Sequence, residues 1–151
     1  HPDTQMFNAD DPRMLEVYDY LQDKAPVLFH CGDYRYDYSN PDHLLPVLNQ
    51  FKNLTIIGAH FGGWSVWDEA CEKLSGYPNF YVDTSSSLYQ LSPQKAVDII
   101  RRYGAGHVLF GSDFPVFSPD IELERFMALP LNDDEKRAIL SENVLRLYNI
   151  K

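Results

Sequence analysis

The chain has 151 residues, of which 44% are hydrophobic and 23% are charged, and its formal net charge is −9. This length and composition are typical of one globular domain and exclude an intrinsically disordered chain. The negative charge disfavours a nucleic-acid partner, and the absence of an apolar run of about 18 residues predicts no membrane span.

The sequence begins His1-Pro2-Asp3-Thr4, without an initiator methionine or the pattern of a signal peptide. We therefore expect residues 1–151 to form a single segment of a longer protein. Cys31 and Cys71 are too few for a disulfide framework, which favours a reduced, cytoplasmic protein.

Helical and strand-like patterns alternate along the chain. Apolar residues recur at the spacing of one helical face in residues 14–21, 44–51, 67–74 and 96–103. The short apolar runs that follow these helices predict β-strands at Val27–His30, Leu54–Ala59, Asn79–Val82 and His107–Phe110. Two or three further helices are expected after the last strand.

Helix starts are predicted where a polar side chain precedes proline, because the side chain caps a free backbone N–H and proline has none to satisfy. Such pairs are Asp11-Pro12, Asn40-Pro41, Ser92-Pro93 and Ser118-Pro119. Two further pairs have capping-box spacing: Ser65 with Asp68, and Asn132 with Glu135.

The alternation, in units of about 25–30 residues, predicts an α/β fold with a parallel sheet of right-handed βαβ units. Helices cover both faces of such a sheet, so its strands should be apolar without alternation. Val27-Leu28-Phe29 and Val108-Leu109-Phe110 have this composition.

A polar residue closes each predicted strand, where the loops of parallel α/β folds carry their chemistry. These residues are His30, His60, Asp83 and Asp113, spaced 30, 23 and 30 positions apart. Imidazole and carboxylate groups bind zinc and similar divalent ions, and such a metal lowers the pKa of a bound water. We therefore predict a site formed by His30, His60 and Asp113.

Other polar residues near the strand ends have competing interpretations. Asp83 precedes a hydroxyl-rich segment, which favours a structural or substrate-contacting role over metal binding. The loop Tyr34–Tyr38, which includes Arg35, either lines a pocket for an acidic or aromatic substrate or forms an exposed surface. Gly62-Gly63 either admits a substrate close to the backbone or permits a tight turn.

Five segments, in order and in register, resemble the amidohydrolase-related family of metal-dependent hydrolases and decarboxylases. They are Val27–Gly32, Gly58–Gly63, Tyr81–Ser85, Val108–Pro115 and Ile139–Tyr148. The resemblance implies a (β/α)₈ TIM-barrel fold in which this chain forms strands five to eight with their helices, a half barrel. It also implies that His1-Pro2-Asp3 is the tail of strand four.

By the same resemblance, His30 is a metal ligand, and Asp113 is a ligand and proton acceptor. His60 is a second ligand or the group that orients and deprotonates a metal-bound water. The family's His-x-His pair at the end of strand one has no counterpart here, so the site of the isolated segment is expected to be incomplete. The expected partner is the missing amino-terminal half of the barrel or a second copy of this chain.

The function predicted first is a metal-dependent hydrolase that cleaves a C–N or C–O bond in a small molecule, with a divalent ion expected to be zinc. Non-oxidative decarboxylation is the alternative within the family. The non-catalytic alternatives are an open, flavodoxin-like small-molecule binding module and a purely structural half barrel. A stoichiometric divalent metal would favour the enzyme, and bound flavin or nucleotide without metal would favour the binding module.

Overall fold

The chain folds around one four-stranded sheet, shown by a computed structural model that describes residues 1–150. Its strands are β1 (Val27–Phe29), β2 (Ile56–Gly58), β3 (Phe80–Asp83) and β4 (Val108–Leu109). They pair in parallel in the order β1-β2-β3-β4, so the predicted parallel α/β sheet is confirmed.

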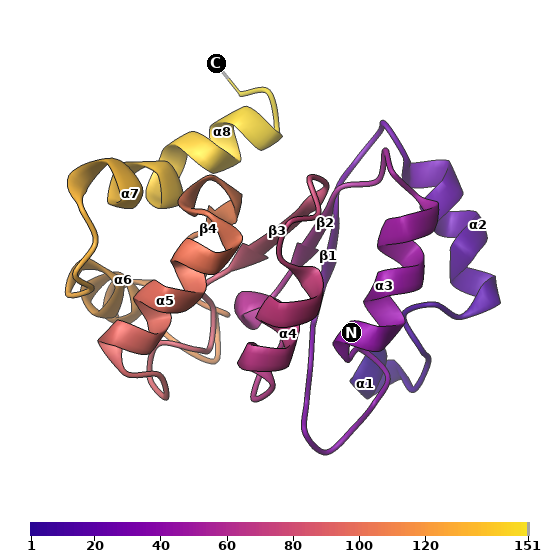
Figure 1. Cartoon of the computed structure of the whole chain (residues 1–151), viewed down its shortest axis with the longest axis horizontal. Coiled ribbons are helices and arrows are strands. Elements are labelled where there is room, and N and C mark those ends of the chain that lie inside the picture. The colour runs from indigo at the N-terminus through magenta and orange to yellow at the C-terminus, as the bar shows by residue number, and fades with distance from the viewer. Residues whose placement is uncertain (151) are drawn as a thin grey trace.

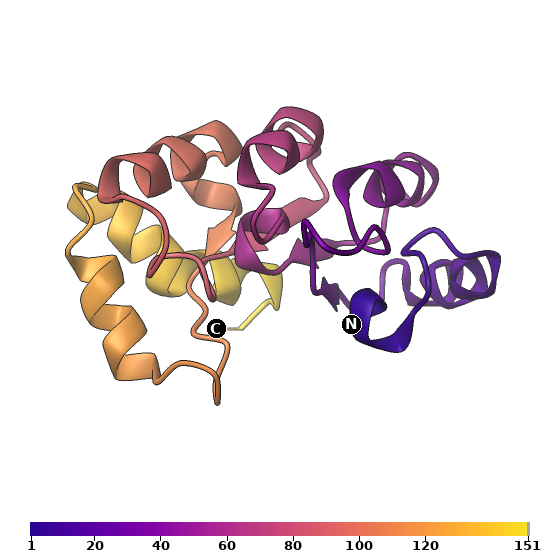
Figure 2. The same ribbon diagram turned by 90° about the horizontal axis from the view of Figure 1, so that it is seen from below.

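Helices connect the strands and cover one side of the sheet. Helix α2 (Pro12–Leu21) precedes β1, and one long helix lies in each crossover between neighbouring strands. These crossover helices are α3 (Pro41–Gln50), α4 (Trp67–Leu74) and α5 (Pro93–Tyr103). Figure 1 shows the whole arrangement, and Figure 2 shows α3, α4 and α5 next to one another along the strands. The four helices predicted from apolar spacing are therefore confirmed.

After β4 the chain forms α6 (Pro119–Met127) and then one continuous helical segment. That segment consists of α7 (Asp133–Arg137), a π-helical turn η3 (Ala138–Glu142) and α8 (Asn143–Leu147). The buried amide of Asn143 donates to the carbonyl oxygens of Ala105 and Val108, both at 2.7 Å. These bonds fix the carboxyl-terminal helices against the start of β4.

The predicted proline caps all stand at helix starts, but their side chains act differently. Asp11 and Ser92 accept a hydrogen bond from the first turn of their helix. Asn40 and Ser118 are N-cap residues without such a bond. The Asn40 side chain instead accepts from the backbone N–H of Asp33 at 3.2 Å, so it stabilises the loop after β1.

One of the two predicted capping boxes is confirmed and the other is wrong. Asn132 and Glu135 exchange both bonds of the motif at the start of α7. Ser65 does not begin α4, whose N-cap is Val66. The Ser65 hydroxyl accepts instead from the backbone N–H of Tyr34 at 3.0 Å, so a contact between loops replaces the cap.

The hydrophobic core lies between the sheet and the crossover helices, where Leu48, Leu74 and Ile100 are fully buried. The expectation that strands are buried on both faces is wrong for β1, because Leu28 is 64% exposed. Successive side chains of a strand point to opposite faces, so Leu28 faces away from buried Phe29 and lines an open pocket.

The amino-terminal residues form a helical turn, which corrects the expectation that His1-Pro2-Asp3 is the tail of a strand. Pro2–Gln5 form the short helix α1, with His1 as its N-cap. The physical reason is local: proline is suited to the first helical position, and His1 Nδ1 accepts from the backbone N–H of Thr4 at 3.3 Å.

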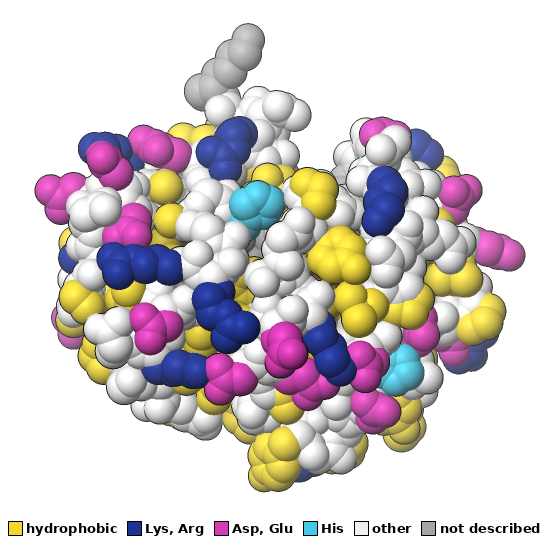
Figure 3. All heavy atoms as spheres, viewed as in Figure 1, with side chains coloured by type: hydrophobic (Ala, Val, Ile, Leu, Met, Phe, Trp, Pro, Cys, Tyr) yellow, Lys and Arg dark blue, Asp and Glu magenta, His cyan; other side chains and the backbone are white. Residues whose placement is uncertain are grey.

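Charged side chains of both signs are mixed over the outer face of the crossover helices (Figure 3). Lys73 pairs with Asp42 and Glu69 there, and Lys95 pairs with Asp68. Among the helices formed by residues 1–150, none has the length and apolar character needed to cross a membrane.

Candidate active site

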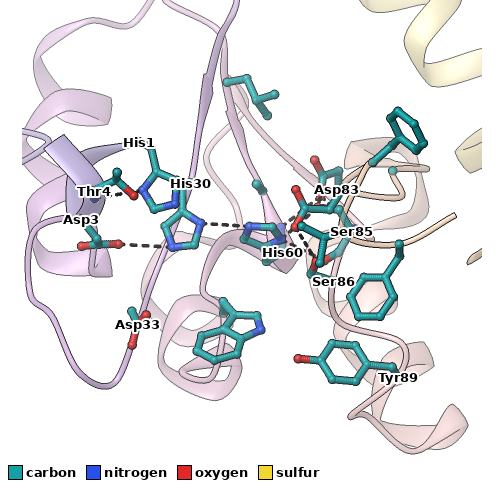
Figure 4. Close-up of a pocket in the computed structure, with 18 of the residues that line it drawn as sticks. His1, Asp3, Thr4, His30, Asp33, His60, Asp83, Ser85, Ser86 and Tyr89 are labelled. Atoms are coloured by element: carbon teal, nitrogen blue, oxygen red, sulfur yellow. Dashed lines mark hydrogen bonds and ion pairs between the residues drawn. The ribbon is translucent and has the colours of Figure 1, made fainter. Parts of the chain in front are cut away.

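One large pocket opens at the carboxyl ends of the strands. It has a volume of about 950 Å³, and the four strand-end residues His30, His60, Asp83 and Asp113 all line it. The structure therefore brings these residues to one mouth of the sheet, as parallel topology requires. Figure 4 shows His30 next to His60, with Asp3 beyond His30 and Asp83 beyond His60.

The loop after β2 holds His60 in a backbone conformation that residues other than glycine rarely adopt. This residue begins the 3₁₀ turn η1 (His60–Gly62), with φ of 60° at His60 and 54° at Phe61. Asp83 Oδ1 accepts from the backbone N–H of His60 at 3.0 Å, and the Tyr103 hydroxyl donates to the Phe61 carbonyl at 3.1 Å. Asp83 thus has the structural role that was one of its two interpretations.

Glycines allow the loops after β1 and β2 to approach each other. Gly32 has a φ of 73°, and a Cβ there would lie 2.6 Å from the Cα of Gly63. A Cβ on Gly63 would lie 2.6 Å from the Cβ of Ala70 in α4. These contacts support the structural interpretation of Gly62-Gly63, because the second glycine serves close packing between loop and helix.

A chain of hydrogen bonds fixes the protons on both histidines. His60 Nδ1 lies 3.0 Å from the carbonyl oxygen of Ser85, which can only accept, so Nδ1 carries the proton. The Ser85 hydroxyl lies 3.0 Å from the same nitrogen and donates to Asp83. His60 Nε2 is then an acceptor, and His30 Nδ1, 3.0 Å away, must donate to it. The neutral His30 ring therefore keeps its lone pair on Nε2.

This His30 Nε2 atom is buried and has no hydrogen-bond partner. It lies 3.3 Å from Asp3 Oδ2, and the other oxygen of Asp3, Oδ1, is also buried and unpartnered. Burial, and next the neighbouring His60, lower the pKa of His30 to about 4, so its ring is neutral at pH 7. A nitrogen lone pair thus faces a carboxylate inside the protein, an arrangement that a bound cation would stabilise.

The Asp3 carboxyl group is anchored through hydrogen bonds to the segment that contains Tyr38 and Ser39. The Ser39 hydroxyl donates to its Oδ2 at 2.7 Å. Burial raises the pKa of Asp3, because desolvation penalises the charged carboxylate more than the Ser39 bond favours it. The site therefore contains a carboxylate whose charge the surrounding side chains compensate incompletely.

Asp113 enters the pocket from the loop after β4. Its backbone is left-handed, with φ of 63°, and its Oδ2 accepts from the Ser86 hydroxyl at 2.5 Å. Thr84 joins this loop to the loop after β3, because its Oγ1 accepts from the backbone N–H of Gly111 at 3.1 Å. Asp113 is thus a further positioned carboxylate of the pocket.

Potential metal ligands gather on the Asp3 side of the pocket. The donor atoms of His1, Asp3 and His30 lie within 4.8 Å of one another, the one such group of three found in residues 1–150. His60 and Asp113 line the same pocket but do not belong to this group. His1 and Asp3 were not among the residues predicted for the site; the available signal was a histidine and a carboxylate two positions apart.

The loop after β1 places a cation and aromatic rings at the pocket. Arg35 is the one Lys or Arg among the lining residues described, and Tyr36 and Trp64 line the pocket beside it. The Arg35 guanidinium pairs with buried Asp33 at 2.6 Å and lies 5.5 Å from the Tyr36 ring centre and 5.6 Å from that of Trp64. This ion pair lowers the pKa of Asp33. Arg35 and Tyr36 thus line the pocket, while Tyr34 and Tyr36 are also exposed, so the loop has features of both interpretations.

Several solved structures share this fold over nearly the whole chain. An uncharacterized TIM-barrel protein, Bb4693 from Bordetella bronchiseptica, has 29% identity and a TM-score of 0.82, over 95% of this chain and 52% of its own. An amidohydrolase from Burkholderia multivorans with bound zinc has 16% identity and a TM-score of 0.75, over 95% and 59%. A 2,6-dihydroxybenzoate decarboxylase from Rhizobium has 20% identity and a TM-score of 0.72, over 95% and 57%.

The chain spans between half and two thirds of the length of these structures, which is consistent with a partial TIM barrel. No curated protein sequence matches it. A family model described as Amidohydrolase matches residues 1–150. The chain also has a pocket that is lined by histidines and aspartates at the ends of parallel strands. The chain therefore belongs to the amidohydrolase family.

Proposed function

We propose that the chain is part of a divalent-metal-dependent hydrolase that cleaves a C–N or C–O bond in a small molecule. One observation carries the proposal: the buried Nε2 of His30 has a lone pair and no hydrogen-bond partner, and an aspartate lies beside it in the pocket. An imidazole nitrogen in this state is a donor suited to zinc and similar ions. The zinc bound to the Burkholderia structure supports the same choice of metal.

His30 and Asp113 are the ligands proposed from the sequence, with His60 as the third member of the set. When bound, the metal would lower the pKa of a water molecule and polarise the bond to be cleaved. His60 Nε2 already accepts from His30 Nδ1. That bond occupies the lone pair of His60, so Nε2 can take up a proton or bind an ion only when the bond opens, and we propose proton transfer as its role.

The surroundings of His60 suit a proton acceptor. Its Nδ1–H is fixed by Ser85, so a second proton can be taken up only at Nε2. The carboxylate of Asp83, joined to the ring through the Ser85 hydroxyl, stabilises the positive charge that this uptake creates. Asp113, held by Ser86, is the second proposed acceptor in the pocket.

Decarboxylation of an aromatic carboxylic acid is the second candidate function, and Arg35 favours it. A guanidinium beside Tyr36 and Trp64 is suited to hold a carboxylate on an aromatic ring. The structural match to a 2,6-dihydroxybenzoate decarboxylase points to the same substrate class.

Metal content and product analysis test the proposal together. The purified protein should hold stoichiometric metal, and His30→Ala and Asp113→Ala should each lose most of the metal and the activity, because each removes a ligand. His107→Gln, which changes a histidine outside the pocket, serves as the control. Assays on amides, esters and aromatic acids then separate hydrolysis from carbon dioxide release. Full metal content and unchanged turnover in both alanine variants would exclude the site.

A further inference from the structure

We infer that His1 and Asp3 form a divalent-cation site with His30, on the side of His30 that faces away from His60. The inference rests on the proposed metal dependence and changes its ligand set. It adds two ligands from the amino-terminal turn and leaves His60 free for proton transfer.

The lone pair of His30 points in a direction fixed by its hydrogen bond. Its Nδ1–H donates to His60, so Nε2 is the one ring nitrogen left to bind an ion. This atom lies 3.3 Å from Asp3 Oδ2. An ion on His30 must therefore lie next to Asp3, and His60 occupies the opposite nitrogen of the same ring (Figure 4).

Asp3 is a buried residue with one unpartnered carboxylate oxygen. Asp3 is 9% exposed, and its Oδ1 has no hydrogen-bond partner. Among the ion pairs of residues 1–150, its one basic neighbour is His30, whose Nδ1–H is already donated to His60. A buried, unpartnered carboxylate oxygen is costly unless a cation or a donor reaches it. A metal ion between Asp3 and His30 would satisfy both orphaned atoms at once.

His1 lies directly beside His30. Its ring stacks on that of His30, with centroids 3.9 Å apart and planes 12° from parallel. It is exposed, and its one hydrogen bond, from the N–H of Thr4, is long at 3.3 Å, so the ring can turn toward the ion. Two imidazoles and one carboxylate form a ligand set typical of catalytic zinc, and all three residues line the pocket.

A purely structural role for Asp3 makes a different prediction. If Asp3 served only to accept from Ser39, then Asp3→Asn would lower the unfolding temperature equally with and without metal. If Asp3 is a ligand, the variant should unfold no earlier than wild type without metal, because it removes an uncompensated charge. The stabilisation conferred by metal should then be lost.

The experiment titrates metal-free protein with zinc chloride by calorimetry and records thermal unfolding with and without zinc. Asp3→Asn should weaken zinc binding by about tenfold or more. Asp33→Asn is the matched control, because Asp33 is also a buried aspartate of the pocket but is already paired with Arg35. Its zinc affinity should remain close to that of wild type.

His1→Gln provides a second test at an exposed position, where folding is not at risk, and it should also weaken zinc binding. Wild-type affinity in folded Asp3→Asn or in His1→Gln would overturn the three-residue site. If Asp113→Asn then abolished binding, the proposed metal enzyme would stand with its original ligands. If wild-type protein bound no zinc, both the inference and the proposed function would fail.

Discussion

At the scale of single residues, the direction of the hydrogen bonds in the pocket decides what each nitrogen can do. Ser85 fixes the proton on His60, and His60 in turn fixes the proton on His30. His30 therefore keeps one nitrogen, Nε2, without a partner, whereas His60 has both nitrogens engaged and can react at Nε2 only when its bond to His30 opens. Asp83 fixes this arrangement, because it accepts hydrogen bonds from both the Ser85 hydroxyl and the backbone N–H of His60.

His60→Asn tests the proton-transfer role of His60. Asparagine tolerates the left-handed backbone at this position, so the loop should keep its shape. The variant should retain more metal than His30→Ala and yet lose about 10²–10⁴-fold in kcat, the usual contribution of a general base. Turnover at saturating metal, with metal content measured on the same samples, provides the check. A near-normal rate would show that His60 is structural.

At the scale of elements, the pocket depends on how closely the loops after β1 and β2 pack. The backbone of Gly32 touches that of Gly63, which in turn packs on α4 through Ala70. This contact sets the separation of the two loops that carry His30 and His60. Backbone packing between the two loops therefore sets the distance between His30 and His60, and contacts of the two imidazole rings do not.

Gly32→Ala should lower the free energy of unfolding by about 1–3 kcal/mol, since its Cβ would overlap the Gly63 backbone. Gly76→Ala is the matched control: it shares the positive φ, at 94°, but a Cβ there meets nothing within 4 Å. Urea unfolding of both variants separates the cost of the contact from the cost of the backbone conformation. Equal losses in the two variants would contradict the packing argument.

The helices and strands could be predicted from the sequence because their signals are local. Helix α5, for example, carries its apolar stripe and its Ser92 cap within its own residues. The pairing of Asp3 with His30 was not predictable in this way, because it joins an amino-terminal turn to a strand end. The exposure of Leu28 was missed for a related reason: an apolar run does not reveal which face of its strand another element covers.

At the scale of the whole molecule, β1 and β4 are the edges of the sheet, and apolar side chains near the pocket remain exposed. Leu28 is 64% exposed, Phe114 73% and Val116 66%. Unpaired strand edges and exposed apolar surface both favour association. We propose that a complementary half of the barrel, or a second copy of the chain, covers them.

Sedimentation of the purified 151-residue chain at micromolar concentration tests this proposal. We expect a dimer or larger species, or a chain that folds stably only with its complementary half. Leu28→Gln should weaken self-association with little effect on the core, because Leu28 is already exposed. A single, cooperatively folded species near 17.5 kDa would contradict the half-barrel proposal.

The order of the strands also has a consequence for how the chain folds during its synthesis. Because the spatial order β1-β2-β3-β4 is the order of translation, every strand after the first finds its neighbour already made. No strand has to wait for a later segment to be inserted between it and its partner. The sheet can therefore grow by addition at the edge opposite β1 as the ribosome releases each βα unit, and the next unit covers that growing edge.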